Sequence, residues 1–226
     1  MALPTPKGLI VSLAGGLQLE GVSVALGGRV LLGPINATVA PGECLTVMGP
    51  SGCGKSTLLA FLAGTLDPMF TAQGRVRIGA SDLTQCPPEQ RHIGILFQDD
   101  LLFPHLSVGA NLAFALPASV RPFSARRERV DQALADAGLE GFAYRDPATL
   151  SGGQRARVAV MRTLSAEPRA LLLDEPFSKL DAQLRGDFRR FVFDHARGRG
   201  LPTVLVTHDE ADALAAGGPV IRIAPT

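Results

Sequence analysis

The 226-residue chain has few cysteines and few lysines. An odd number of cysteines without CxxC spacing argues against a disulfide framework or a zinc site, so we expect reduced thiols. The cysteines are Cys44, Cys53 and Cys86. Arginine supplies nearly all the positive charge, and the three lysines are Lys7, Lys55 and Lys179. A lysine that falls inside a motif is therefore informative.

An excess of one charge and long apolar runs are also absent. The net charge of +1 leaves no broad basic field of the kind that binds nucleic acid or an acidic membrane surface. No apolar run approaches the roughly 18 residues that span a bilayer, so a role at a membrane would depend on a partner. Apolar residues at 46% and charged residues at 19% are typical of a globular protein, expected here as one domain with an inserted lobe.

The N-terminal run LIVSLAGGLQL, which follows Lys7, resembles a short signal peptide. It shows no cleavage site, and the segment from Leu17 to Leu26 predicts a first strand instead. We therefore expect a cytoplasmic protein.

Turn residues divide the chain into short apolar strands and amphipathic helices. Residues 17–47 predict strands separated by GG and PG turns, and KSTLLAFLAGTL predicts a helix. GRVRIGAS predicts a half-exposed strand, and IGILFQ predicts a buried strand that ends at Gln98. From Asp99 to about Arg162 helices prevail, and the charged run RPFSARRERV predicts a solvated helix face. RALLLDEP and LPTVLVTHD then predict buried parallel strands on either side of the amphipathic segment LRGDFRRFVFDHARG.

The segment GPSGCGKST fits the phosphate-loop pattern G-x-x-x-x-G-K-[ST], with a predicted strand before it and a predicted helix after it. Glycines allow backbone N–H groups to close around phosphates, and the start of the helix adds partial positive charge. Lys55 would reach the β- and γ-phosphates, and the Ser56 hydroxyl would ligate Mg²⁺. The expected nucleotide-binding residues are Gly49, Pro50, Ser51, Gly52, Cys53, Gly54, Lys55, Ser56 and Thr57.

Three further strand ends carry polar side chains. ALLLDEP ends in Asp174, expected to hold the metal through water, and in Glu175, expected to act as general base. Gln98 would reach Mg²⁺ or the attacking water, and His208 would donate to the γ-phosphate. Because ligands of open α/β sheets gather at the carboxyl ends of parallel strands, we expect these side chains to converge. The histidines that lack such a setting, and that we interpret as structural or surface residues, are His92, His105 and His195.

The segment LSGGQ, from Leu150 to Gln154, is a second glycine turn before a helix, and it contains no lysine. Such a turn binds anions through backbone N–H groups, a serine hydroxyl and the helix dipole. It also fits an ordinary helix start with Ser151 as N-cap. We expect both descriptions to hold.

Together these segments resemble the nucleotide-binding subunit of an ATP-binding cassette (ABC) transporter over nearly the whole chain. GPSGCGKS resembles the family's Walker A loop, IGILFQ the Q-loop, LSGGQ the signature, ALLLDEP Walker B, SKLD the D-loop and VTHD the histidine switch. The resemblance implies an α/β fold: a P-loop NTPase core with a mainly parallel sheet, an N-terminal antiparallel β subdomain and an inserted helical lobe. A single ABC ATPase domain, 1–226, would divide into a core, 1–98 and 163–226, and a lobe, 99–162.

The resemblance also implies how such a subunit works. Two copies pack head to tail, and each ATP lies between the Walker A loop of one copy and the signature of the other. ATP and Mg²⁺ are the implied cofactors. The implied partners are a second copy, integral membrane permease subunits and a separate solute-binding protein, on the inner face of the cell membrane. The residues implied to complete the partner's site are Ser151, Gly152, Gly153, Gln154 and Asp181.

The segment LLFPHLSVGANLAF is similar to that of bacterial uptake systems of the thiamine, polyamine or iron type, in which the lobe receives a short helix of the membrane subunit. Four apolar residues would suit such a dock or would equally suit the core of the lobe: Leu101, Leu102, Phe103 and Leu106. An ABC protein of translation or DNA repair usually has two cassettes or a long coiled coil, which 226 residues do not hold. A small-molecule P-loop kinase should lack LSGGQ.

Two residues depart from the family pattern. Leu26 stands where an aromatic residue usually stacks on adenine. Since base–aromatic stacking is worth roughly 1–3 kcal/mol, we expect weaker discrimination for adenine. Lys179 stands in the D-loop where a small residue is commoner, and a pairing across the dimer is one interpretation of it.

Overall fold

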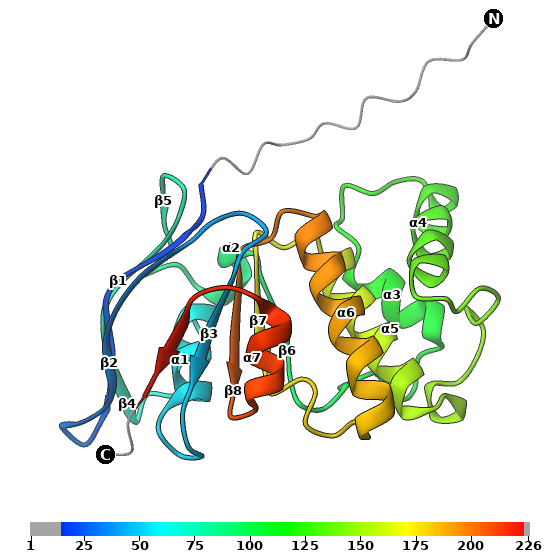
Figure 1. Ribbon diagram of the computed structural model, residues 1–226. Coiled ribbons are helices and arrows are strands. Elements are labelled where there is room, and N and C mark those ends of the chain that lie inside the picture. Colours follow the sequence, from blue (N-terminus) through cyan, green and yellow to red (C-terminus); the bar gives the residue numbers. More distant parts are fainter. Residues whose placement is uncertain (1–14, 224–226) are drawn as a thin grey trace, which may run out of the picture.

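A computed structural model describes residues 15–223, with a five-stranded parallel sheet at its centre (Figure 1). The strand order is β6-β7-β8-β3-β9. The strands are β3 (Cys44–Met48), β6 (Ile93–Leu96), β7 (Ala170–Asp174), β8 (Thr203–Thr207) and β9 (Val220–Arg222). The run that resembles a signal peptide lies largely outside the described residues.

A four-stranded antiparallel sheet, in the order β2-β1-β4-β5, forms a second layer. Its strands are β1 (Leu17–Leu26), β2 (Arg29–Val39), β4 (Phe70–Ile78) and β5 (Ser81–Asp82). The turn between β1 and β2 consists of Gly27 and Gly28, with φ of 56° and 81°. A two-residue hairpin needs positive φ at both positions, which glycine adopts without strain. The expected N-terminal antiparallel subdomain is confirmed.

Helix α1 (Lys55–Ala63) lies between the two sheets and forms a core with both of them. Leu58 and Leu62 of α1 are fully buried in this core, together with Leu172 of β7. The neighbours of Leu172 along the strand, Leu171 and Leu173, belong to a second core on the opposite face. Successive side chains of a strand point to opposite faces, so the parallel sheet is covered on both sides.

The remaining helices complete an α/β fold of the predicted class. Three of them, α3, α4 and α5, follow β6 and lie at the end of the molecule opposite the antiparallel sheet (Figure 1). The bounds are α2 (Pro88–Arg91), α3 (Val108–Ala115), α4 (Phe123–Asp136), α5 (Gly152–Ser165), α6 (Ala182–Gly198) and α7 (Glu210–Ala216), with a 3₁₀ turn at Pro147–Thr149. The predicted helical character of this region is confirmed.

One predicted strand end differs from the structure. The predicted strand end at Gln98 is wrong, because β6 ends at Leu96, opposite Leu173, where its pairing with β7 stops. The division of the chain into a core and a lobe stays a prediction.

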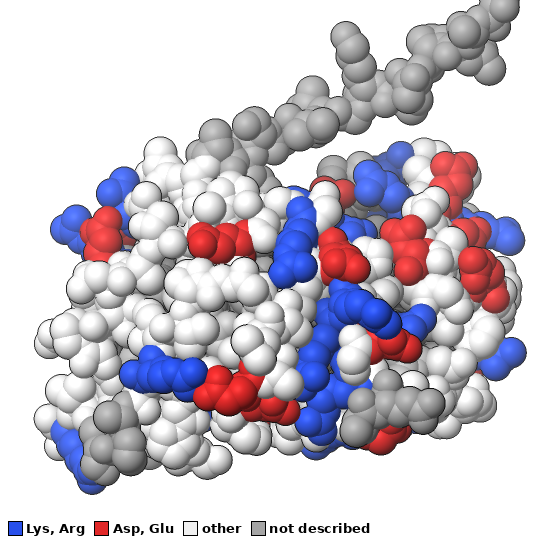
Figure 2. All heavy atoms as spheres, in the orientation of Figure 1, with Lys and Arg blue, Asp and Glu red and all other residues white. Residues whose placement is uncertain are grey.

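Charged side chains of both signs are mixed over the face drawn in Figure 2. The charged run at the start of α4 is largely exposed, including Arg127, Glu128 and Arg129. The predicted solvated helix face is therefore confirmed.

Candidate functional site

The phosphate-loop segment connects β3 to α1 at the carboxyl edge of the parallel sheet. Gly54, immediately before α1, has φ of 91°. A Cβ on Gly49 would lie 2.8 Å from Cys53 Sγ, so this position has no room for a side chain. Both positions therefore favour glycine. A helix that begins directly after such a turn is the arrangement that binds phosphate.

Lys55, the first residue of α1, is buried at this turn with 5% of its surface exposed. Its Nζ donates to the carbonyl oxygens of Gly49 at 2.9 Å and Pro50 at 2.8 Å, and it lies 3.9 Å from Glu175 Oε1. An ammonium group has three N–H donors, so one remains for an oxygen of a ligand. The setting fits a lysine that binds phosphate.

Ser56 and Asp174 bring two further oxygen ligands together. Ser56 Oγ donates to Asp174 Oδ1 at 2.9 Å. Burial raises the pKa of Asp174, and the hydrogen bond from Ser56 offsets part of the rise. A partly desolvated carboxylate beside a hydroxyl offers the hard oxygen ligands that Mg²⁺ takes, so these residues fit that ion.

Glu175 directly follows β7 in a left-handed conformation, with φ of 46°. Its N–H donates to the carbonyl oxygen of Val206 at 3.1 Å, and its Oε2 lies 3.2 Å from His208 Nδ1. Asp174 thus faces Ser56, whereas the Glu175 carboxylate lies between Lys55 and His208. Glu175 can therefore accept a proton at a position that Lys55 and His208 also border.

Gln98 lies at the same edge of the sheet but does not join the contacts among Lys55, Glu175 and His208. It lies two residues beyond β6 and is exposed. Within residues 15–223, no hydrogen bond joins its side chain to Asp174, Glu175 or His208. The structure therefore brings Lys55 together with the ends of β7 and β8, and leaves Gln98 at the rim.

The signature segment forms the start of α5. Ser151 Oγ accepts from Gln154 N at 3.3 Å, and Ser151 N donates to Gln154 Oε1 at 3.0 Å, so the expected N-cap is part of a full capping box. A Cβ on Gly153 would lie 3.6 Å from Leu184 of α6, whose N–H donates to Asp181 Oδ1 at 2.9 Å. Within residues 15–223, no hydrogen bond joins this group to the phosphate loop.

Ion pairs that the sequence did not predict hold the segment after Gln98. Arg155 Nε lies 3.5 Å from Asp100 Oδ2, and Arg162 donates to the Asp100 carbonyl oxygen at 3.3 Å. Lys179 pairs with Asp99 of its own chain, and the interpretation of a pairing across the dimer stays a prediction. The signal that could have revealed the group is the seven-residue spacing of the two arginines, which places both on one face of a helix.

The four apolar residues considered for a dock are divided in exposure. Leu101 is 56% exposed, whereas the other three are half-buried and Leu102 packs against the second core. Leu26, at the end of β1, is 39% exposed, so it offers an aliphatic surface where a stacking residue was expected.

The fold and the site define a P-loop ATPase core that carries an LSGGQ lobe. The sequence profile of the ABC transporter family, described as "ABC transporter", matches residues 32–178. The uncharacterized ABC transporter ATP-binding protein YnjD of Escherichia coli K12 is 52% identical over 196 residues, 87% of this chain and 90% of its own. The chain therefore belongs to the ABC transporter family, as one of its ATP-binding and ATP-hydrolysing proteins.

Two further relatives are longer proteins. The putative 2-aminoethylphosphonate import ATP-binding protein PhnT of Salmonella typhimurium is 46% identical over 203 residues, 88% of this chain and 53% of its own. The Fe(3+) ions import ATP-binding protein FbpC of Brucella abortus is 42% identical over 207 residues, 92% of this chain and 58% of its own. The chain thus spans little more than half the length of these two relatives. In residues 15–223 the structure contains no helix that is both long and apolar enough to cross a membrane.

Proposed function

We propose that the chain powers the import of a small solute by hydrolysing ATP while bound to a separate integral membrane permease. The names of PhnT and FbpC as import ATP-binding proteins support the direction of transport. A separate solute-binding protein would deliver the solute, and the chain would lie on the cytoplasmic face of the cell membrane. The apolar group at Leu101, Leu102, Phe103 and Leu106 is the proposed dock for a short permease helix.

The observation that carries the proposal is the division of the site between two parts of one chain. The phosphate loop and the ends of β7 and β8 form one group, and the capped turn at Ser151 lies on the helical lobe with its serine exposed. In a head-to-tail dimer, the turn of one copy would close over the γ-phosphate bound by the other. Backbone N–H groups and a hydroxyl suit this task, because they bind an anion without a second lysine.

The chemistry follows from the residues at the sheet edge. Glu175 accepts a proton from water as the water oxygen forms a bond to the γ-phosphorus and the bond from that phosphorus to the β–γ bridging oxygen breaks. Lys55 stabilises charge on the phosphate oxygens, and His208 orients the γ-phosphate against Glu175. Mg²⁺, held by Ser56 and Asp174 with Gln98 at the rim, would supply charge neutralisation of the phosphates.

The substitution Glu175→Gln tests the assignment. It keeps the shape of the side chain and removes the base, so we expect turnover to fall by about 100-fold or more while ATP binding persists. The variant should accumulate as an ATP-bound dimer, measured by size-exclusion chromatography with ATP.

The control variant is Glu167→Gln, because Glu167 is also a glutamate in the left-handed conformation, with φ of 52°, and lies away from the sheet edge. It should keep the wild-type rate. A Glu175→Gln protein that stays monomeric and active would refute the assigned base.

A further inference from the structure

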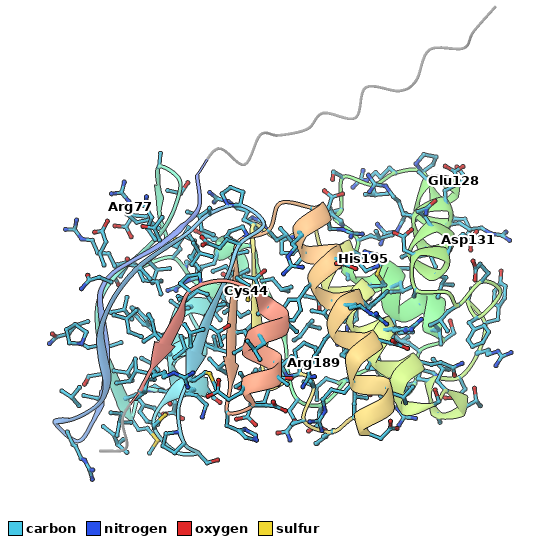
Figure 3. The ribbon with its side chains drawn as sticks, in the orientation of Figure 1. Cys44, Arg77, Glu128, Asp131, Arg189 and His195 are labelled. Atoms are coloured by element: carbon cyan, nitrogen blue, oxygen red, sulfur yellow. The ribbon has the colours of Figure 1, made fainter. Side chains whose placement is uncertain are left out.

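A network of buried polar groups lies beneath His208 and joins α6, α7 and the end of β8. Asp212 of α7 is 3% exposed. Arg189 of α6 donates from Nε to Asp212 Oδ1 at 2.5 Å, and Thr207 donates from Oγ1 to Asp212 Oδ2 at 2.9 Å. Figure 3 labels Arg189, whose side chain extends from α6 toward α7. Both carboxylate oxygens of Asp212 are therefore engaged.

The Thr207 hydroxyl connects this network to the backbone around His208. It donates to Asp212 and also accepts from the N–H of Asp209 at 3.0 Å. Asp209 in turn accepts at Oδ1 from Ala211 N at 2.7 Å, and its Oδ2 lies 3.2 Å from Arg185 of α6. The residues on both sides of His208 are thus fixed by hydrogen bonds that start from a buried carboxylate.

The imidazole of His208 has no such enclosure. Its side chain is 58% exposed, and its one ion pair within residues 15–223 is the contact of Nδ1 with Glu175 Oε2 at 3.2 Å. An exposed ring that must meet a partner at a fixed distance depends on the placement of its backbone. A buried ion pair such as Arg189–Asp212 adds little net stability compared with well-packed apolar residues of similar volume. Its role here is therefore to hold Thr207 and the following backbone in a fixed position.

We propose that Thr207 and Asp212 are positioning residues for His208, with Arg189 holding Asp212 in place. This inference rests on the proposed function, in which His208 orients the γ-phosphate. The Thr207 hydroxyl links the buried carboxylate to the loop, and Arg189 Nη2 adds a second contact, to Asp209 Oδ2 at 3.3 Å. Because Thr207 directly precedes His208, removal of its hydroxyl should misplace the ring while leaving the nucleotide-binding loop untouched.

The experiment compares two substitutions at Thr207 by steady-state ATPase kinetics at a protein concentration that supports dimers. Thr207→Val keeps the shape and lacks the hydroxyl, and we expect kcat to fall at least about tenfold with KM for ATP unchanged. Thr207→Ser restores the hydroxyl and should recover most of the rate. The matched control is Thr203→Val, because Thr203 lies at the other end of β8 and is 2% exposed, and within residues 15–223 its hydroxyl donates only to the Leu201 carbonyl oxygen, at 3.1 Å.

A second comparison separates positioning from a general loss of structure. In a His208→Ala background, Thr207→Val should slow turnover by less than about twofold, because a residue that acts through His208 has nothing left to position. An equal loss in both backgrounds, or no loss from Thr207→Val in the wild type, overturns the inference and leaves the proposed function standing. Wild-type turnover by His208→Ala alone would instead overturn the role given to His208.

The Asp212→Asn variant keeps the inference testable should Thr207→Val unfold. Asparagine preserves the shape and weakens the bond from Arg189, so we expect an intermediate loss of kcat with an unchanged KM. An Asp212→Asn protein that matches the wild type in kcat, with folding checked by circular dichroism, would contradict the role of Asp212.

Discussion

At the scale of the residue, the left-handed conformation of Glu175 sets the direction of its carboxylate. A non-glycine residue in this conformation costs on the order of 1–3 kcal/mol, which the surrounding contacts must offset. The N–H bond to Val206 and the contact with His208 fix the turned residue at the end of β7. Asp174, the preceding residue, accepts a hydrogen bond from Ser56 instead. The left-handed residue therefore lies where two adjacent acids contact different partners.

Leu26 supports a prediction about nucleotide choice. Without an aromatic ring at this position, GTP should compete with ATP almost equally in a filter-binding assay. The substitution Leu26→Tyr should tighten ATP binding by at least about fivefold, because stacking on a base is worth roughly 1–3 kcal/mol. A strong preference of the wild-type protein for ATP over GTP would contradict this expectation.

His195 supports a prediction about stability and pH. Burial lowers the pKa of His195, and the nearby Arg199 guanidinium lowers it further, against the opposing charges of Asp136 and Asp194. The folded protein therefore binds fewer protons than the unfolded chain near pH 6, so the stabilising effect is complete above the unfolded pKa of about 6.5 and is lost as the pH falls below it.

Thermal unfolding at pH 7.5 and pH 5.5 provides the measurement. The fall in Tm between these values should be smaller for His195→Gln than for the wild type, because glutamine does not titrate. Arg199→Gln should also reduce the fall, since it removes the neighbouring cation. An unchanged difference in Tm for His195→Gln would show that another group carries the dependence.

The residues at the site differ in how far the sequence predicts them. Lys55, Asp174, Glu175 and His208 follow strands in motifs, and strand ends meet at one edge by geometry alone, so their meeting could be predicted. Asp212 could not, because it lies four positions after His208 and nothing in that spacing indicates that its carboxylate turns back to Thr207. Hydrogen-bond direction depends on packing that local patterns do not contain.

At the scale of the element, a buried arginine fastens the C-terminal end of α1. Arg91 is 4% exposed, and its Nη1 donates to the carbonyl oxygens of Phe61 at 2.8 Å and Leu62 at 2.9 Å. Its other nitrogens donate to the carbonyl oxygens of Cys86 at 2.7 Å and Thr84 at 2.9 Å. A helix end leaves such carbonyls without partners, and a cation there also suits the helix dipole.

The substitution Arg91→Leu should therefore destabilise the protein by about 3 kcal/mol or more, because it removes the shared donor of four buried or partly buried carbonyl groups. Urea unfolding followed by circular dichroism measures the change. The control Arg127→Leu, at an exposed position on α4, should alter stability by at most about 0.5 kcal/mol. Equal stability of Arg91→Leu and the wild type would refute the fastening role.

The type and approximate position of the elements can be predicted from the sequence, whereas the residues at which they end are predicted less well. Apolar spacing and turn residues predict α1, α5, β7 and β8, since each has a strong period or a clear boundary. The end of β6 depends on where β7 stops offering partners, and α2 depends on Arg91 reaching the end of α1. Both are tertiary effects that no window of sequence contains.

At the scale of the whole molecule, the division of the site makes activity depend on association. One chain holds the phosphate loop, and its own signature turn makes no hydrogen bond to that loop within residues 15–223. We therefore expect the ATPase rate per chain to rise with protein concentration. A rate that stays constant down to strictly monomeric dilution would overturn the shared site.

The variant Ser151→Ala refines this prediction. It should leave ATP binding by a single chain largely intact but weaken dimerisation, measured by analytical ultracentrifugation with ATP. The matched control is Ser107→Ala, because Ser107 is the N-cap of α3 in the same lobe and accepts from Ala110 N at 3.2 Å. Both variants lose a cap worth about 1 kcal/mol, and only Ser151→Ala should affect the dimer.

The two cores on either face of β7 also constrain how this protein can vary over evolutionary time. Leu171 and Leu173 enter one core and Leu172 enters the other. A single inserted residue in this strand would exchange the faces of every later side chain and displace both acids at its end. The strand can therefore exchange one aliphatic residue for another, but its length is fixed, and insertions belong in the loops on the opposite edge.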